Sequence, residues 1–338
     1  MRMESNFRDQ MIKSGSKKSA HEYLTEHDGD FEVWYNNAGY YTFEKGFVVP
    51  KAPTTRHHQD EPDPLFKWVI RKDNGEPIGI HGPGYSENTS YKFVADMMES
   101  FLPESTTGCA VLDGGRRLFM TQSIGEPIDL GGGDVIKPEI AWTASFDGTW
   151  STGVYDFTTR VFCSNMLMMG TALFKARRTE QHDITAEYRS KILGDAMAHA
   201  EAMKLLAVTL KNRPYTDEQF DILTKQLVPE PKSTSMTGWK APHHKTVENW
   251  KEKMYWFNNE WRRETETWDD KNKWLAYNAI QGAEQHHINL GQRGNQVVKR
   301  TRSLIKAVEG KTPLAKKTLE LLNAVSYTHL TLPTTPYV

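Results

Sequence analysis

The chain has 338 residues, of which 38% are hydrophobic and 11% aromatic, so it is long enough and apolar enough to bury one or two cores. Its 42 Lys and Arg residues balance 43 Asp and Glu residues, and the net charge of -1 excludes a global electrostatic attraction to nucleic acid or to a membrane surface. Nucleic-acid contacts would have to come from local basic patches.

The two cysteines, Cys109 and Cys163, are far apart in the sequence, which is typical of a reducing compartment rather than of a disulfide-stapled secreted domain. No apolar run approaches the roughly 20 residues that span a bilayer. The N-terminal residues 1–18 also lack the apolar centre of a signal peptide. We therefore expect a cytoplasmic protein without a membrane segment.

Composition divides the chain into five segments. They are a polar arm at 1–30, an α+β core domain at 31–229, a Pro-, Ser- and Thr-rich linker at 230–244, a helical, Trp-rich and basic region at 245–324, and a tail at 325–338. Residues Val325–Thr334 spell VSYTHLTLPT, which matches a translated sequencing-library adapter. We expect this tail to be non-native and exclude it from fold reasoning.

In the first 130 residues, turn signals separate strand-like runs. Ser19 and Glu22 predict a capped helix, and an apolar stripe of period 3.6 predicts a second helix at Tyr91–Phe101, capped by Asn88 or Ser90. The strand-like runs are Phe31–Tyr35, Tyr40–Val49, Phe66–Arg71 with Pro77–Ile80, and Cys109–Leu112 with Arg116–Thr121.

The central stretch contains the strongest hairpin signal. Two runs rich in aromatic and β-branched residues, Glu139–Ser145 and Thr149–Thr159, are joined by a tight turn at Phe146-Asp147-Gly148. The triple glycine 131–133 predicts a turn before them, and an apolar helix is expected to start near Met166.

Helical patterns dominate the second half. A long helix is predicted at Ile184–Asn212 with a seam of Tyr188, Ile192, Ala196, His199, Met203, Leu206 and Leu210, and a short one follows from Thr216 to Leu227. Five tryptophans then lie on a helical, charged background, and residues 291–317 carry a local net charge of +7. We predict an α+β fold, in which an antiparallel sheet of β-hairpins is covered on one side by helices and is followed by a mainly helical C-terminal region.

Several motifs, in order over residues 30–290, resemble the phage/plasmid-like family known as domain of unknown function 932. The motifs are Gly82-Pro83-Gly84-Tyr85 before an aromatic helix, Leu112 to Arg117, Ser145-Phe146-Asp147-Gly148, Arg160 to Leu167, and Trp274 to His286 or His287. Phe146 replaces the histidine that is usual in the family, which favours a structural role for that turn. Phe162 replaces a valine.

The resemblance implies little about activity. Members of the family lie on phages and plasmids, often beside replication and recombination genes, and the predicted order of hairpins and helices is similar to the core of single-strand annealing proteins. A fold analogy of this kind does not fix a function.

Cations around the predicted sheet are the candidate nucleic-acid site, because phosphates need cations on a rigid backbone and bases need aromatic rings to stack on. The set comprises Arg116, Arg117, Arg160, Lys175, Arg177 and Arg178, with Trp142, Trp150 and Tyr155 for stacking. The alternative is that the cations solvate strand ends, that Arg160 pairs with a local carboxylate, and that the aromatic rings fill the core.

Other chemistry finds less support. Glu284 and His287 lie three residues apart and can share a helix face, but a second motif that would complete a metal site is missing. Cys163 has apolar neighbours that suggest burial. No phosphate-loop, nucleophile-elbow or zinc-protease pattern is present. We therefore assign no catalytic residue, metal or cofactor, and favour a protein that is not an enzyme.

Two functions remain. The first is a phage- or plasmid-type accessory protein that binds nucleic acid non-covalently, with single-stranded DNA as its partner in replication or recombination and with self-assembly into homo-oligomers. The second is a protein-interaction factor that uses its aromatic C-terminal helices to modulate a host or plasmid protein.

Overall fold

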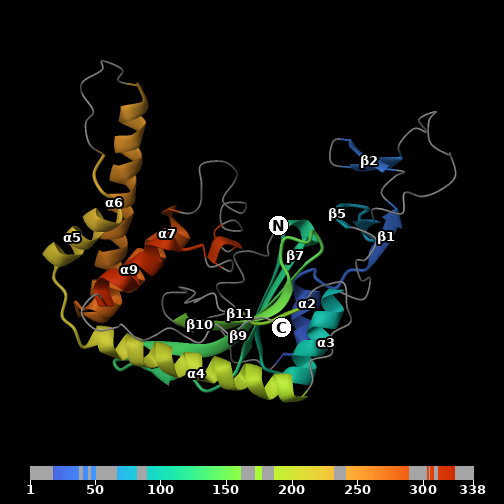
Figure 1. Cartoon of the computed structure of the whole chain (residues 1–338), viewed down its shortest axis with the longest axis horizontal. Coiled ribbons are helices and arrows are strands. Elements are labelled where there is room, and N and C mark those ends of the chain that lie inside the picture. Colours follow the sequence, from blue (N-terminus) through green and yellow to red (C-terminus); the bar gives the residue numbers. More distant parts are fainter. Residues whose placement is uncertain are drawn as a thin grey trace. The chain divides into compact units, whose positions relative to one another are not determined.

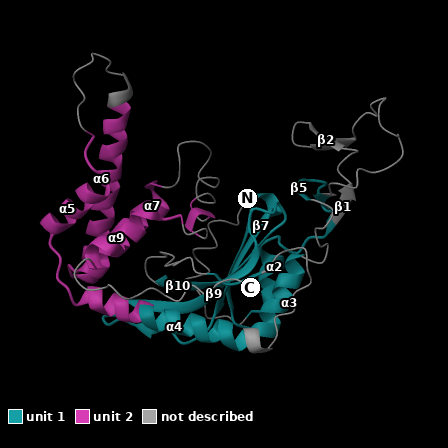
Figure 2. Ribbon diagram, viewed as in Figure 1, with its two compact units in different colours: residues 1–202 teal, residues 203–338 magenta. Residues whose placement is uncertain are grey.

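The computed structural model describes residues 18–37, 41–44, 47–50, 67–81, 90–160, 172–176, 186–231, 241–288, 303, 305–307 and 311–323. It divides into two compact units, Met1–Ala202 and Met203–Val338 (Figures 1 and 2), and the division falls inside helix α4 (Ala186–Lys211). The predicted tail at 325–338 lies outside the described residues. None of the helices in the described ranges is long and apolar enough to cross a membrane.

A six-stranded antiparallel sheet forms the centre of the first unit. Its strands are β6 (Thr106–Leu112), β7 (Arg117–Ser123), β9 (Val135–Ser145), β10 (Thr152–Arg160) and β11 (Ala172–Ala176) in the order β11-β10-β9-β7-β6, with β8 (Ile128–Asp129) paired to β9. A 3-10 turn, η2 (Asp113–Gly115), connects β6 to β7. The sheet confirms the predicted antiparallel architecture.

The predicted central hairpin is confirmed as β9–β10, with Gly153 opposite Thr143 and Arg160 opposite Ile136. The connection is longer than the predicted tight turn, because six residues, 146–151, separate the two strands. Asp147 shapes it by accepting hydrogen bonds from the backbone N–H and the hydroxyl of Thr149, and Gly148 has φ +70°. Asp and Gly therefore do make the turn, but as part of a wider loop.

Helices cover one face of this sheet. Helix α2 (Ala20–Glu26) begins at the predicted Ser19–Glu22 capping box, and α3 (Tyr91–Phe101) begins at the Ser90 cap. Side chains of α2, α3 and α4 share one buried core with the sheet residues Leu118, Met120, Ile140, Trp142, Ala144 and Val154. Phe146 belongs to the same core, 4.6 Å from the Tyr91 ring centroid, which fits a packing role.

The N-terminal strands differ from the prediction. A separate three-stranded sheet pairs β1 (Val33–Asn37), β4 (Lys67–Arg71) and β5 (Pro77–His81), of which β4–β5 is the expected hairpin. The run Tyr40–Val49 is not one strand, because it splits into β2 (Tyr41–Glu44) and β3 (Phe47–Pro50), which pair with each other. Gly46 lies between the two strands in the sequence, and a glycine inside a strand-like run is a turn signal that the prediction of one strand did not use.

The smaller sheet meets the β9–β10 loop by a close backbone contact. A Cβ atom added at Gly79 of β5 would lie 1.9 Å from the carbonyl oxygen of Phe146. The imidazole of His81, two residues later, bonds to the same carbonyl oxygen. Only glycine fits at position 79.

The segment after β10 contains a strand where the sequence predicted helix. Residues 172–176 form β11, which pairs with β10 through Gly153 and Lys175. The predicted helix start near Met166, Cys163, and the cations Arg177 and Arg178 all lie outside the described residues.

The long helix is confirmed as α4. Its buried positions include Ile192, Ala196, His199, Met203 and Leu210 of the predicted seam, with Ala207 in place of Leu206. The predicted packed histidine, His199, also places its Nδ1 atom 2.9 Å from Oδ2 of Asp156 on β10.

The second unit is helical, with α5 (Asp217–Leu227), α6 (Ala241–Trp268), α7 (Lys273–His286) and α9 (Pro313–Asn323). Trp261 stacks on Phe220 at 4.6 Å, and Trp274 is fully buried, so these rings are core. Tyr255 on α6, by contrast, has 61% of its surface exposed.

Candidate nucleic-acid interface

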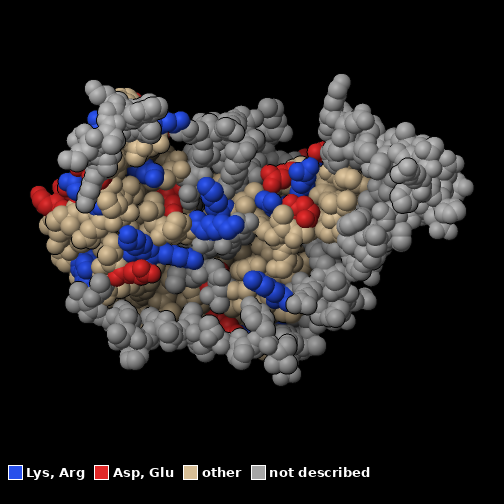
Figure 3. Space-filling model, turned by 45° about the horizontal axis from the view of Figure 1, so that its top comes forward, with Lys and Arg blue, Asp and Glu red and all other residues tan. Residues whose placement is uncertain are grey.

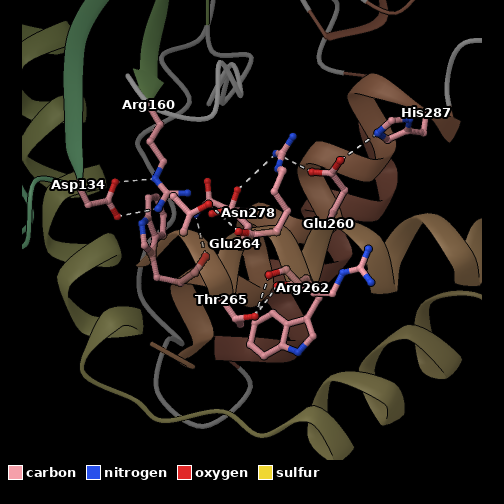
Figure 4. A network of polar contacts seen from close by, with 12 residues as sticks. Asp134, Arg160, Glu260, Arg262, Glu264, Thr265, Asn278 and His287 are labelled. Carbon is pink, nitrogen blue, oxygen red and sulfur yellow. Dashed lines mark hydrogen bonds and ion pairs between the residues drawn. The ribbon is translucent and has the colours of Figure 1, made fainter. Parts of the chain in front are cut away.

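Arg160, the last residue of β10, is buried rather than presented at the surface. Its Nε and Nη2 atoms donate to the two carboxylate oxygens of Asp134 at 2.6 and 2.8 Å (Figure 4). The triple-glycine turn carries Asp134 to this position, because Gly131, Gly132 and Gly133 all have positive φ. The exposed fractions of the two side chains are 0% and 1%. The alternative of a local carboxylate pair therefore holds for Arg160, and the folded chain does not offer it to a ligand.

Trp142 is likewise a core residue. Its side chain is 1% exposed, its ring lies edge-on to Phe101, and its indole N–H donates to Gln122 Oε1 at 3.0 Å. Gln122 in turn donates to the backbone carbonyls of Met98 and Leu102 at the end of α3. Trp142 links the sheet to α3, and a base has no access to its ring.

Arg117 is held by the loop between β9 and β10. Its guanidinium lies 3.3 Å from Asp147 and 3.3 Å from Asp113, and it donates to the Thr149 hydroxyl at 2.8 Å. It also lies 5.6 Å from the centroid of the Trp150 ring. Because it pairs with Asp113 and Asp147, Arg117 stabilises the loop. The neighbouring residue Arg116 is half-exposed.

Lys175 and Tyr155 are the two candidate residues that the structure brings together at the surface. Lys175, which is exposed on the edge strand β11, places its Nζ atom 5.7 Å from the centroid of the Tyr155 ring on β10. Gly153 makes room for this contact, because an added Cβ atom would come within 3.2 Å of the Tyr155 ring. No carboxylate in the described part of the chain pairs with Lys175.

Sequence reasoning missed a buried acid on the same sheet. Glu139 of β9 is 2% exposed and accepts hydrogen bonds from the hydroxyls of Thr107 and Thr159, at 2.7 Å for Thr159. Burial raises the pKa of Glu139, and the two hydroxyl donors oppose that shift in part. The sequence did contain a signal for this buried acid, because Glu139 is a single acidic residue in an otherwise apolar strand pattern.

We expect Glu139→Gln to remove a pH-dependent loss of stability. Because the folded state raises this pKa above its ordinary value of 4.5, the folded chain binds more protons than the unfolded chain above about pH 4.5, and stability falls as the pH rises. The variant gains about 1.4 kcal/mol over the wild type for each unit of the shift. Urea unfolding between pH 4.5 and 8 measures this, with the exposed Glu126→Gln as control. Parallel curves for wild type and Glu139→Gln would contradict it.

Glu284 and His287, which the sequence places three residues apart, do not form a metal-binding pair, because each contacts a different partner. The Glu284 carboxylate accepts the backbone N–H groups of Leu314 and Ala315 and so caps α9, whereas His287 contacts Glu260 on α6. No cluster of three metal-ligating side chains occurs among the residues that the structure describes.

A family model for a domain of unknown function, DUF932, matches residues 87–307. The chain belongs to this family. The DUF932 match begins just before α3, includes the whole of the larger sheet, and extends past α7, so the Lys175–Tyr155 pair and the Arg160–Asp134 pair both lie inside the domain. Neither the curated proteins nor the solved structures contain a significant match to the chain.

Proposed function

We propose that this DUF932 protein binds single-stranded nucleic acid non-covalently, as a cytoplasmic accessory protein of phage or plasmid replication or recombination that assembles into homo-oligomers. The observation that carries the proposal is the Lys175–Tyr155 pair on the edge of the sheet, where a cation that pairs with no carboxylate of the described residues lies beside a half-exposed ring. A cation of this kind attracts a phosphate, and the ring face stacks a base.

The proposal needs only a local site. Among the described residues drawn in Figure 3, basic side chains stand in small groups, some of them beside acidic ones. Each copy of the protein would therefore bind nucleic acid weakly, and stable binding would depend on several copies bound along one nucleic-acid strand.

Fluorescence anisotropy with a labelled oligothymidylate tests the proposal. We expect Tyr155→Ala to weaken binding by about 5- to 150-fold, since base stacking contributes about 1–3 kcal/mol. Lys175→Ala is expected to reduce the dependence of log K on log salt by about 0.7, the value for one phosphate contact on a single strand.

Two controls make this experiment specific. Lys175→Arg keeps the charge and should retain the salt dependence, and Lys191→Ala removes an exposed cation on α4 and should bind as the wild type does. Absence of binding by the wild-type chain at about 50 mM salt would refute the proposal.

A second candidate function is protein interaction through the C-terminal helices. It is favoured by the exposed Tyr255 ring on α6, which stands beside Trp256 at 5.0 Å between ring centroids. Exposed aromatic rings are typical anchors of protein interfaces. This candidate predicts no salt-dependent binding to single-stranded DNA, so the same titration separates the two.

A further inference from the structure

Two cations of the second unit, Arg213 and Lys273, lie opposite each other where the end of α4 meets the start of α7. Pro214 and Asn272 form an antiparallel bridge at this point. The next residues along the bridge are Arg213 and Lys273, and the backbone N–H of Lys273 donates to the Arg213 carbonyl oxygen at 3.0 Å. Opposite residues of an antiparallel pair place their side chains on one face. We call these two residues the cation pair, and both belong to the second unit.

The surrounding structure fixes the cation pair in place. On the other side of the bridge, the backbone N–H of Tyr215 donates to the Lys271 carbonyl oxygen at 3.0 Å. The Lys273 side chain is itself held, because its Nζ atom donates to the carbonyl oxygen of Leu322 in α9 at 3.0 Å. Both members of the cation pair are half-buried. Little conformational entropy therefore remains to be lost when a ligand binds between them.

The acidic residues on either side of the bridge bond to other groups. Asp217 pairs with the Lys271 ammonium at 2.6 Å. Asp270 accepts hydrogen bonds from the backbone N–H of Lys271 and from the side-chain amide of Asn272. Within the described part of the chain, no carboxylate forms an ion pair with either member of the cation pair.

The positive charge at this point is costly for the folded chain. Burial lowers the pKa of Lys273, and the charge of Arg213 lowers it further. Lys273 is also the first residue of α7, where the helix dipole opposes a cation, and the first turn of α7 contains no acidic residue. Like charges that lie opposite each other on paired strands are destabilising. A bound anion would remove this repulsion.

We propose that the cation pair is a binding site for one phosphate group. The Arg213 guanidinium has the planar geometry that donates two parallel N–H bonds to two phosphate oxygens, and the Lys273 ammonium adds a second positive charge. Inorganic phosphate and the phosphodiester of a nucleic-acid strand both offer these oxygens. The site contains neither Lys175 nor Tyr155, so this proposal and the proposed function can fail separately.

Hydrogen exchange of the full-length chain tests the phosphate site. Mass spectrometry follows the exchange while inorganic phosphate replaces chloride at constant pH and ionic strength. We expect a saturable rise in the protection of residues 213–216 and of the first turn of α7, from which a dissociation constant follows. Arg213→Gln should raise this constant by about 10- to 150-fold, the range for a hydrogen bond to a charged group.

Matched variants assign the binding to the cation pair. Arg213→Lys keeps the charge but not the paired donors, so its loss of affinity should be smaller than that of Arg213→Gln. Lys251→Gln removes an exposed cation of α6 in the same unit and should bind as the wild type does. Lys273→Gln should also weaken binding, and it serves if Arg213→Gln fails to fold. Equal protection of the wild type in phosphate and chloride, or an unchanged constant in Arg213→Gln, would overturn the proposal.

A titration with labelled oligothymidylate identifies the source of the phosphate. If Arg213→Gln weakens binding of both oligothymidylate and inorganic phosphate, the site holds a backbone phosphate of the strand. If it weakens only the binding of inorganic phosphate, the site holds a free phosphate. A wild-type chain that binds inorganic phosphate but no oligothymidylate would refute the proposed function and support the phosphate site.

Discussion

Replacing Arg160 with alanine is expected to lower the free energy of unfolding of the first unit by about 3–5 kcal/mol. The loss comes from Asp134, the ion-pair partner that remains buried in the variant. The Asp134 carboxylate is 1% exposed and receives two donors from Arg160, so the variant leaves a buried charge without its counter-ion. Urea unfolding, with hydrogen exchange of β10 to assign the loss to this unit, measures the effect.

A double variant separates the buried ion pair from simple loss of packing. Arg160→Met combined with Asp134→Leu removes both charges and should recover most of the stability, because an apolar pair of similar volume often replaces a buried ion pair without cost. Arg160→Ala with wild-type stability but weakened DNA binding would instead mean that Arg160 reaches the surface, against the geometry described above.

Trp142→Ala is expected to cost about 3–5 kcal/mol, the range for truncating a large buried aromatic side chain. The substitution opens a cavity between the sheet and α3, and it leaves Gln122 Oε1 without the indole donor. Thermal and urea unfolding report the loss, and near-ultraviolet circular dichroism reports whether the remaining core stays ordered.

Trp142→Phe is the matched control for this core residue. It keeps most of the apolar volume and removes the N–H donor, so its cost should be about 1–3 kcal/mol. Because the ring is buried, the folded variant should bind single-stranded DNA as the wild type does. A stable Trp142→Phe protein that has lost binding would restore the interpretation of Trp142 as a stacking residue.

Local signals predicted much of the fold. The Ser19–Glu22 capping box, the apolar stripe of Tyr91–Phe101 and the Asp147-Gly148 turn act over a few residues, and each lies where the sequence placed it. Interactions of this range are encoded by spacing alone. The family resemblance is confirmed by the DUF932 match, while the association with phages and plasmids stays a proposal.

The partners of individual side chains were not predictable in the same way. Arg160 and Asp134 are 26 residues apart and meet only because a glycine turn and a strand register bring them together. The sequence around Trp142 does not tell whether its side chain faces α3 or solvent, because the strand register determines which face of the sheet the side chain lies on. Glu260 and His287 meet through helix packing, which no short pattern encodes.

The contact at Gly79 also constrains how the chain reaches its final arrangement. A one-residue slip of β5 would present Ile78 or Ile80 to the Phe146 carbonyl, where there is no space for a side chain. Misaligned forms of the small sheet therefore cannot dock on the β9–β10 loop, and only the correctly aligned hairpin is captured. Glycine at position 79 therefore specifies the register of β5 as well as the close approach of the two sheets.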